Sequence, residues 1–229
     1  MENTFIGIDL SLNSTGICIR TNNNFRWISF YRTEDGRDKL IRRKNSVFSS
    51  LEEIKGVSIE YLDKPTFEGE YHIREYLKMN AFSDASNRII EILNPYLKEG
   101  CIVGIEGLSY GSPGNSLIDI SMLTALVRKR IMDKIGYSNF FVFSPSTIKK
   151  WAIKGNAKKG EIMRALIQRE SEFPIIKHFT DVLENNLDTW VKKGDKVISP
   201  VSDLIDATWI CLFTENFLRN IQINNSCNL

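Results

Sequence analysis

The stretch Thr4-Phe5-Ile6-Gly7-Ile8-Asp9-Leu10, followed by the turn Ser11-Leu12-Asn13-Ser14-Thr15-Gly16, decides how the rest of the chain is interpreted. Its short apolar run, bounded by turn residues, predicts a strand that is buried on both faces. Asp9 stands at the end of this strand, where burying an ionised carboxylate is costly unless it is paired or binds a metal. Asp9 therefore has two interpretations: it caps a turn, or it is the first carboxylate of a metal site.

The length and composition are those of an ordinary globular protein. With 229 residues, 42% of them hydrophobic and 25% charged, the chain is long enough for a sizeable core. We expect a single domain over residues 1–229, with insertions at about 34–70 and 171–200. The N-terminus shows no signal peptide and no apolar run is long enough to cross a bilayer, so we expect a cytoplasmic protein without a membrane partner.

The distribution of charged residues, cysteines and histidines limits the kinds of functional site that the chain can contain. The net charge is only +2, but basic residues cluster at 37–44, 128–134, 149–164 and 192–196. These clusters are either solvated faces or one surface that follows phosphates. The four cysteines form no CxxC pair and the two histidines lie near no motif, which argues against disulfides, zinc sites and histidine-based catalysis.

The order of predicted elements indicates an α/β chain with a mixed sheet. Three strands joined by tight turns should be antiparallel, and the later strands alternate with helices. The predicted strands are 4–10, 15–21, 25–33, 101–105 and 139–143, and the predicted helices are 73–97, 116–135, 161–170 and 202–220. The segment 57–62 is strand-like as well.

Four acidic residues stand at the ends of these elements. Asp9 and Glu106 each end a predicted strand, and Asp203 and Asp206 lie three residues apart at the start of the last helix. If the two strands are parallel neighbours, the carboxylates meet at one sheet edge, where they repel unless cations neutralise them. Oxygen ligands of this kind favour Mg²⁺ or Mn²⁺, and two such ions support phosphodiester hydrolysis.

Each acid also has a plainer interpretation. Asp203 and Asp206 complement a helix dipole, and Glu106 caps a loop, in many proteins without a metal site. The joint pattern is more specific than any one member, because all four acids fall where a single topology needs them.

At this point the sequence resembles a known family, the RuvC-type Holliday junction resolvases. Residues 5–16 resemble the first motif of that family, and Ile105-Glu106-Gly107 resembles its second acidic strand. Residues 144–150 and 155–159 resemble the exit of the fifth strand and the basic loop that ends in a functional lysine. Asp203-Leu204-Ile205-Asp206-Ala207 resembles the closing Asp-x-x-Asp-Ala motif.

This resemblance implies a ribonuclease H-like fold: a mixed five-stranded sheet, three antiparallel strands then parallel strands, flanked by helices. It also implies a homodimer that makes paired, Mg²⁺-dependent nicks in four-way DNA junctions. Carried over by position, the metal ligands and catalytic acids are Asp9, Glu106, Asp203 and Asp206. Lys159 is expected near the scissile phosphate, although the neighbouring Lys158 could take the same role.

The resemblance also suggests residues that contact DNA. The candidates are Tyr110, as an aromatic wedge that stacks on an unpaired base, and the basic residues Lys149, Lys150, Lys154 and Lys158. A helix near 116–135 corresponds to the family's dimer helix, with an apolar stripe at Met122, Leu123, Leu126 and Val127 of a kind that more often belongs to a core.

Three classes of function remain open from the sequence. The first is a metal-dependent endonuclease for four-way junctions, with forks or flaps as variant substrates. The second is a sugar-kinase or Hsp70-like ATPase, which shares a Gly-Ile-Asp strand but requires a later glycine-rich phosphate loop that Glu106-Gly107 and the residues after it do not supply. The third is a non-catalytic nucleic-acid-binding protein, against which the presence of all four acids argues.

Overall fold

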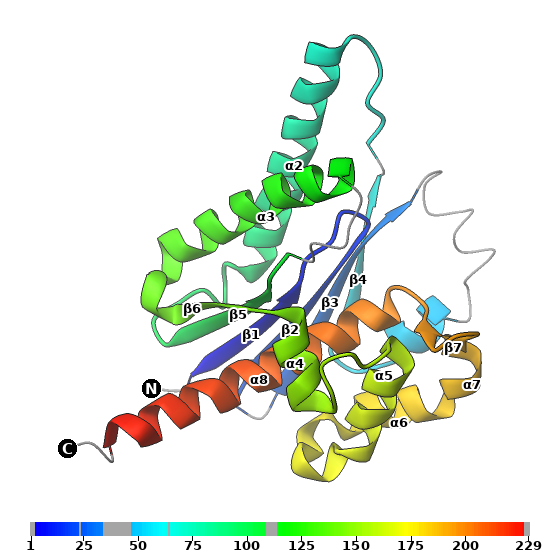
Figure 1. The fold of residues 1–229 in the computed structure, drawn as a ribbon, viewed down its shortest axis with the longest axis vertical. Helices are drawn as coiled ribbons and strands as arrows, with labels where there is room; N and C mark the ends of the chain where they lie inside the picture. Colours follow the sequence, from blue (N-terminus) through cyan, green and yellow to red (C-terminus); the bar gives the residue numbers. More distant parts are fainter. Residues whose placement is uncertain (1–2, 23, 34–46, 64, 109–113, 227–229) are drawn as a thin grey trace.

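The computed structural model describes residues 3–22, 24–33, 47–63, 65–108 and 114–226, whose arrangement is shown in Figure 1. Six strands form one sheet in the spatial order β4-β3-β2-β1-β5-β6. Their bounds are β1 Thr4–Asp9, β2 Ser14–Thr21, β3 Asn24–Thr33, β4 Val57–Asp63, β5 Cys101–Glu106 and β6 Phe140–Phe143. β1 lies inside this sheet, between antiparallel β2 and parallel β5.

The strand directions confirm the ribonuclease H-like mixed sheet expected from the sequence. β1, β2 and β3 are antiparallel neighbours, whereas β5 runs parallel to β1 and β6 parallel to β5. The sheet has six strands where five were expected, because the strand-like segment 57–62 forms β4 and pairs parallel with β3. Parallel neighbours require a crossover connection, and a short helix at residues 47–52 lies within it.

Helices cover both faces of the sheet (Figure 1). α2 and α3 lie on one face, and α8 crosses the other together with the smaller helices α4, α5 and α6. The helix bounds are α2 Tyr71–Leu93, α3 Gly114–Ile135, α4 Pro145–Ala152, α5 Lys159–Gln168, α6 Lys177–Asn185, α7 Leu187–Trp190 and α8 Val201–Ser226. Short 3₁₀ turns follow α3 (η1 Tyr137–Asn139) and α5 (η2 Glu170–Glu172, η3 Pro174–Ile176), and β7 Val191–Lys192 pairs with β8 Lys196–Val197.

The alternation of side chains along the strands decides which residues face α8. In β1, Ile6 and Ile8 pack in the core under α2 and α3, whereas Phe5 packs in the core on the α8 side. Successive side chains of a strand point to opposite faces, so Asp9 shares the α8 face with Phe5. The same alternation in β5 puts Ile102 and Glu106 on that face.

Three glycines allow α8 to lie directly on the sheet. A Cβ atom at Gly7 would come within 2.2 Å of the Ala207 carbonyl oxygen, and one at Gly104 within 2.0 Å of the Thr214 hydroxyl oxygen. The third, Gly16 of β2, faces the first turn of the helix. Since a larger residue at these positions would force neighbouring atoms of α8 to shift, the glycines fix how closely α8 approaches β1, β2 and β5.

The apolar stripe expected on α3 is largely core. Leu123 and Val127 are 2% and 0% exposed and pack against the sheet, with Met122 and Leu126 partly buried around them. Leu123 and Val127 are therefore not exposed to a second subunit.

The segment 171–200 contributes to the core of the α8 face. Phe179, Leu183 and Trp190 are fully buried, and the ring of Phe179 stacks on Trp27 with 4.6 Å between centroids. Cys18, Cys101 and Cys211 are buried free thiols, and Cys227 lies outside the described residues. None of the helices in the described ranges is long and apolar enough to span a membrane.

Candidate active site

Asp9 and Glu106 lie side by side at the carboxyl ends of the neighbouring strands β1 and β5, and we call this end of the sheet its acidic edge. The parallel register pairs Ile8 with Ile105, so the next residue of each strand, Asp9 of β1 and Glu106 of β5, occupies equivalent positions. Burial raises the pKa of Asp9 to about 8; Lys159 opposes this shift, and the charges of Glu106 and Asp203 add to it. Burial also raises the pKa of Glu106, against the attraction of Lys159 and Lys149.

Neither of these two carboxylates has a polar partner within the described part of the chain: no hydrogen bond or ion pair reaches the side chain of Asp9 or Glu106 from a described residue. A buried carboxylate without hydrogen bonds is costly to ionise. The edge of the sheet therefore carries two acids whose ionised forms lack compensation from the protein apart from nearby lysine charges.

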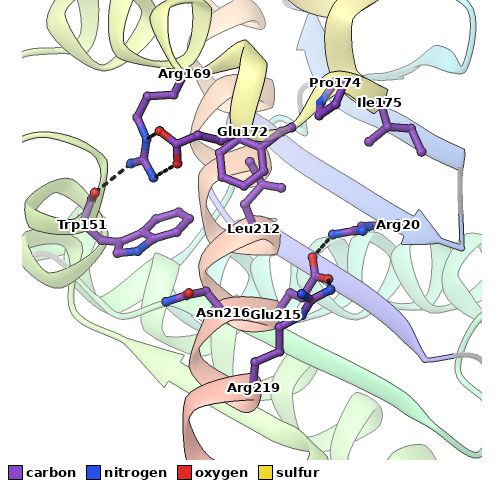
Figure 2. A pocket seen from close by; sticks show the side chains of 11 residues that line it. Arg20, Trp151, Arg169, Glu172, Pro174, Ile175, Leu212, Glu215, Asn216 and Arg219 are labelled. Atoms are coloured by element: carbon purple, nitrogen blue, oxygen red, sulfur yellow. Dashed lines mark hydrogen bonds and ion pairs between the residues drawn. The ribbon is translucent and has the colours of Figure 1, made fainter.

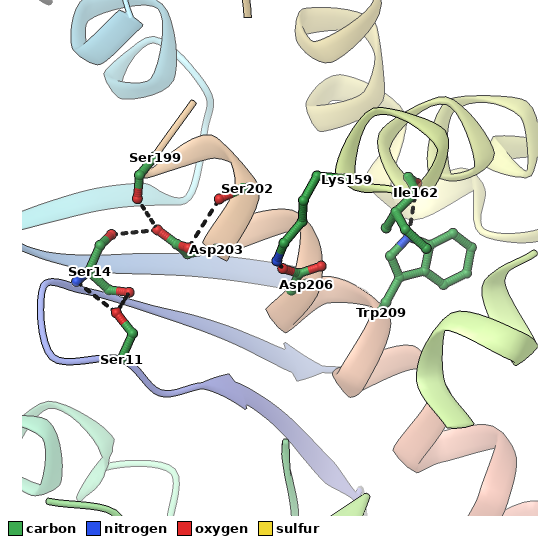
Figure 3. Close-up of polar contacts among 9 residues, drawn as sticks. All are labelled: Ser11, Ser14, Lys159, Ile162, Ser199, Ser202, Asp203, Asp206 and Trp209. Atoms are coloured by element: carbon green, nitrogen blue, oxygen red, sulfur yellow. Dashed lines mark hydrogen bonds and ion pairs between the residues drawn. The ribbon is translucent and has the colours of Figure 1, made fainter. Parts of the chain in front are cut away.

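Asp203 is held by hydroxyl groups from three serines (Figure 3). Ser14 donates a hydrogen bond of 2.6 Å to Asp203 Oδ2, Ser199 donates to the same oxygen, and Ser202 donates to Oδ1 at 3.1 Å. Ser14 is itself fixed, because its amide donates to the Ser11 hydroxyl at 3.0 Å and its carbonyl accepts from that hydroxyl at 2.8 Å. The β1–β2 turn thus sets the orientation of the first carboxylate of α8.

Asp206 lies one helical turn further along and pairs with Lys159 (Figure 3). Lys159 is the first residue of α5, whose start is fixed by the Glu161 carboxylate accepting from the Lys158 amide at 2.8 Å. The indole of Trp209 in α8 also donates to the Ile162 carbonyl at 3.2 Å. These contacts join α5 to α8 and direct Lys159 towards the acids, with 41% of its side chain exposed.

The remaining basic candidates differ in how close they lie to the acids. Lys149 of α4 is near enough to lower the pKa values of Asp9 and Glu106, whereas Lys150 and Lys158 are exposed. Lys154 pairs with Glu161, which partly neutralises it. Tyr110, the candidate wedge, lies outside the described residues.

Four supporting residues were not singled out from the sequence. Ser14, Ser199 and Ser202 surround Asp203, and Arg128 of α3 donates a long hydrogen bond of 3.4 Å from Nη2 to the backbone carbonyl of Glu106. Burial lowers the pKa of Arg128. Ser14 belongs to the quoted turn and Ser202 precedes the acid in the chain, but no local pattern connects Ser199 or Arg128 to the acids.

The four acids provide the oxygen ligands that a hard divalent cation prefers. Their side chains are not already arranged around a common point. Within the described ranges, no three His, Cys, Asp or Glu side chains are gathered closely enough to hold a metal ion. Asp203 is directed towards its serines and Asp206 towards Lys159. The unpartnered carboxylates of Asp9 and Glu106 are oxygen donors of the class that Mg²⁺ and Mn²⁺ prefer, and a cation would offset the cost of their burial.

No family model matches the sequence, and no curated protein matches it. The solved structures that are similar to this chain include the following three. T. thermophilus RuvC in complex with a Holliday junction substrate is 14% identical with a TM-score of 0.48, over 95% of each chain. A structure of Thermus thermophilus RuvC is 12% identical with a TM-score of 0.44, over 93% of this chain and 96% of that chain.

The third is the yeast mitochondrial Holliday junction resolvase Ydc2, which is 14% identical with a TM-score of 0.42, over 90% of this chain and 75% of its own. At these identities the similarity concerns the course of the backbone. The chemistry of this chain depends on its own side chains.

Proposed function

We propose that this chain is a metal-dependent endonuclease that cuts branched DNA, with four-way junctions as its substrate. One observation carries the proposal: the buried Asp9 and the partly buried Glu106 end adjacent parallel strands beneath the helix that carries Asp203 and Asp206. The same four residues form the motifs that resemble RuvC-type resolvases. A non-catalytic role would not require buried acids that lack protein partners.

The residues of the site have separate roles in this proposal. Asp9, Glu106, Asp203 and Asp206 would hold Mg²⁺ or Mn²⁺, with two ions expected. Such ions activate water and stabilise the leaving oxygen in phosphodiester hydrolysis. The serines around Asp203 restrict its carboxylate to one orientation, which lowers the conformational entropy that this side chain loses when metal and substrate bind.

Lys159 is the cation that an incoming phosphate would meet. Its ammonium group already lies beside Asp206 and is partly open to solvent. A positive charge at this position stabilises the negative charge that develops on the phosphate oxygens. Lys149 adds a second positive charge near the same edge. We assign Lys150, Lys154 and Lys158 to contacts with the DNA backbone beyond the cut, where affinity depends on charge rather than geometry.

Paired nicks at a four-way junction require two active sites, so we propose a homodimer. The apolar surface that suits this role lies on the first half of α2 and the start of α3, where Tyr71, Tyr76 and Ile118 are 72%, 66% and 60% exposed. Tyr71 and Ile118 line the same surface hollow. Large apolar side chains that are exposed on neighbouring helices are typical of interaction surfaces.

The proposal is tested by incubating the purified protein with a labelled synthetic four-way junction, with and without Mg²⁺, beside forked DNA and linear duplex. Symmetric paired nicks in the junction alone, only with metal, are the expected result. Cleavage of forks but not junctions would keep the site and change the substrate. Tight junction binding without any cleavage, in Mg²⁺ and in Mn²⁺, would overturn the assignment as a nuclease.

A further inference from the structure

A pocket of about 440 Å³ lies beside the middle of α8, further along this helix than Asp203 and Asp206. Its walls come from α8, the end of β2, α4 and the turns η2 and η3 that follow α5 (Figure 2). None of its lining residues belongs to the candidate active site. Asp206 and Glu215 of α8 are nine residues apart, which corresponds to roughly 13 Å along a helix at about 1.5 Å per residue.

One wall of the pocket holds a buried acid between two arginines. Glu215 is 6% exposed, and its carboxylate pairs with Arg20 of β2 and with Arg219 Nη2 at 2.6 Å. Figure 2 shows both guanidinium groups converging on this carboxylate. Two positive charges on one negative charge leave an excess of one positive charge on the wall.

This excess charge remains available to a ligand. A guanidinium group carries five N–H donors, and Glu215 accepts one contact from each arginine. Burial lowers the pKa of Arg20, and repulsion from Arg219 adds to that effect. Glu215 already occupies the space between the two guanidinium groups, so a ligand anion would bind on their pocket side and use the donors that do not face Glu215.

The opposite wall is aromatic and electrically neutral. The rings of Trp151 and Phe173 lie 6.3 Å apart, and the Arg169 guanidinium stacks 4.8 Å from the centre of the Trp151 ring. The charge of Arg169 is matched by Glu172, which accepts two hydrogen bonds of 2.7 Å from it. Leu212 adds an apolar surface between the two walls. Because Arg169 also lies 5.7 Å from the centre of the Phe173 ring, a flat aromatic ring would stack on this guanidinium plane and on the edges of the two rings.

We propose that this pocket binds a nucleotide, with the phosphate on the pocket side of Arg20 and Arg219 and the base against the wall formed by Trp151, Arg169 and Phe173. The volume falls within the range of about 300–1,000 Å³ that is usual for small-molecule sites. The same chemistry is offered by a free mononucleotide and by an unpaired terminal nucleotide of a DNA strand. The inference does not depend on the proposed nuclease activity, because it uses none of the acids.

The test uses the full chain in EDTA, so that metal-dependent cleavage does not interfere. Deoxyadenosine 5′-monophosphate is titrated by calorimetry and by tryptophan fluorescence, since Trp151 lines the pocket whereas Trp27, Trp190 and Trp209 are buried. We expect saturable binding with quenching, and at least tenfold weaker binding of deoxyadenosine and of inorganic phosphate. A 5′-phosphorylated oligodeoxynucleotide that competes would identify a strand end as the source, and one that does not would identify the free nucleotide.

Arg219→Gln is the decisive variant, because 67% of the Arg219 side chain is exposed and the substitution should leave folding intact. We expect it to weaken mononucleotide binding at least tenfold. Trp151→Phe should remove most of the quenching while calorimetric binding persists. Arg88→Gln is the matched control, since Arg88 is a surface arginine of α2 that pairs with Glu60 outside the pocket. No binding by the wild type at millimolar nucleotide, or equal binding by Arg219→Gln, would overturn the proposal.

Discussion

The backbone carbonyl of Asp203 lies directly over Gly16: a Cβ atom at Gly16 would come within 2.1 Å of that oxygen. Gly16 is also the residue of β2 that pairs with Asp9 of β1. The absence of a side chain at one position therefore brings the first acid of α8 over the strand pair that ends in Asp9. Backbone packing, rather than contact between the acids themselves, assembles this edge.

Gly16→Ala tests that relationship. The added methyl group must displace the first turn of α8, and we expect a loss of roughly 1–3 kcal/mol in the free energy of unfolding, as in other overpacked sites. The rate of junction cleavage should fall by more than the decrease in the folded fraction accounts for, because Asp203 moves with the first turn of α8. Chemical denaturation and junction cleavage measure the two effects. Gly155→Ala is the control, since its Cβ would meet neighbours no closer than 3.6 Å; equal effects of the two substitutions would contradict the account.

Asp9→Asn should abolish cleavage while leaving junction affinity nearly unchanged. The substitution removes a carboxylate from the proposed metal site, whereas phosphate contacts by basic residues supply most of the binding energy. Cleavage of a labelled junction and a gel-shift titration in EDTA report the two properties separately. Retained cleavage by this variant would refute the site assignment.

The same substitution should change how stability depends on pH. The Asp9 carboxyl ionises near its usual value of 3.8 in the unfolded chain but at about 8 in the folded one. Between these values the unfolded state has released a proton that the folded state keeps, so this group lowers stability as pH rises. In EDTA, the gain in the free energy of unfolding from Asp9→Asn should be larger at pH 8 than at pH 5, by at least about 1 kcal/mol. A gain that is the same at both pH values would contradict the burial of an unpartnered carboxyl.

Ser14→Ala should reduce turnover more than substrate affinity. The hydroxyl donates to the Asp203 carboxylate, and a hydrogen bond to a charged group is worth about 1.5–3 kcal/mol, so kcat should fall about tenfold or more with KM little changed. The Mg²⁺ concentration needed for half-maximal rate should rise as well. Ser121→Ala is the control, because that hydroxyl bonds only to the Leu117 carbonyl of its own helix. An unchanged metal dependence would assign Ser14 a purely structural role.

Lys159→Gln and Lys158→Gln distinguish two neighbouring lysines that the sequence leaves equivalent. Lys159 pairs with Asp206, whereas Lys158 is exposed at the helix cap. We expect the loss of Lys159 to lower kcat on the order of 100-fold, as for other groups that stabilise transition-state charge. The loss of Lys158 should weaken binding modestly and make it less sensitive to salt. The reverse order of effects would exchange the two roles.

Tyr76→Glu should separate the proposed dimer. A charge at this exposed tyrosine of α2 opposes burial of the helix surface against a second copy, so the mass in solution should fall from twice 26.3 kDa to 26.3 kDa. Light scattering coupled to size-exclusion chromatography measures this mass. Tyr137→Glu serves as the control, since Tyr137 is 71% exposed on another part of the surface. A wild-type protein that is already monomeric would contradict the interface.

The sequence by itself determined the strands, the positions of the four acids at element ends, and the expectation that β1 and β5 carry acids to one edge. This was possible because apolar runs, turn residues and helix starts are local signals, and the two-residue period of a strand assigns each side chain to a face. The parallel register that pairs Ile8 with Ile105 then sets Asp9 beside Glu106.

Only the tertiary structure decided the rest. It showed that 57–62 adds a sixth strand, that Leu123 and Val127 are core, and that Lys159 rather than Lys158 faces the acids. Ser14 reaches Asp203 across 189 positions of chain, and the pocket beside Glu215 gathers residues from five elements. Such contacts are set by how helices pack on the sheet, and packing depends on the shapes of residues distant in sequence, which no local pattern records.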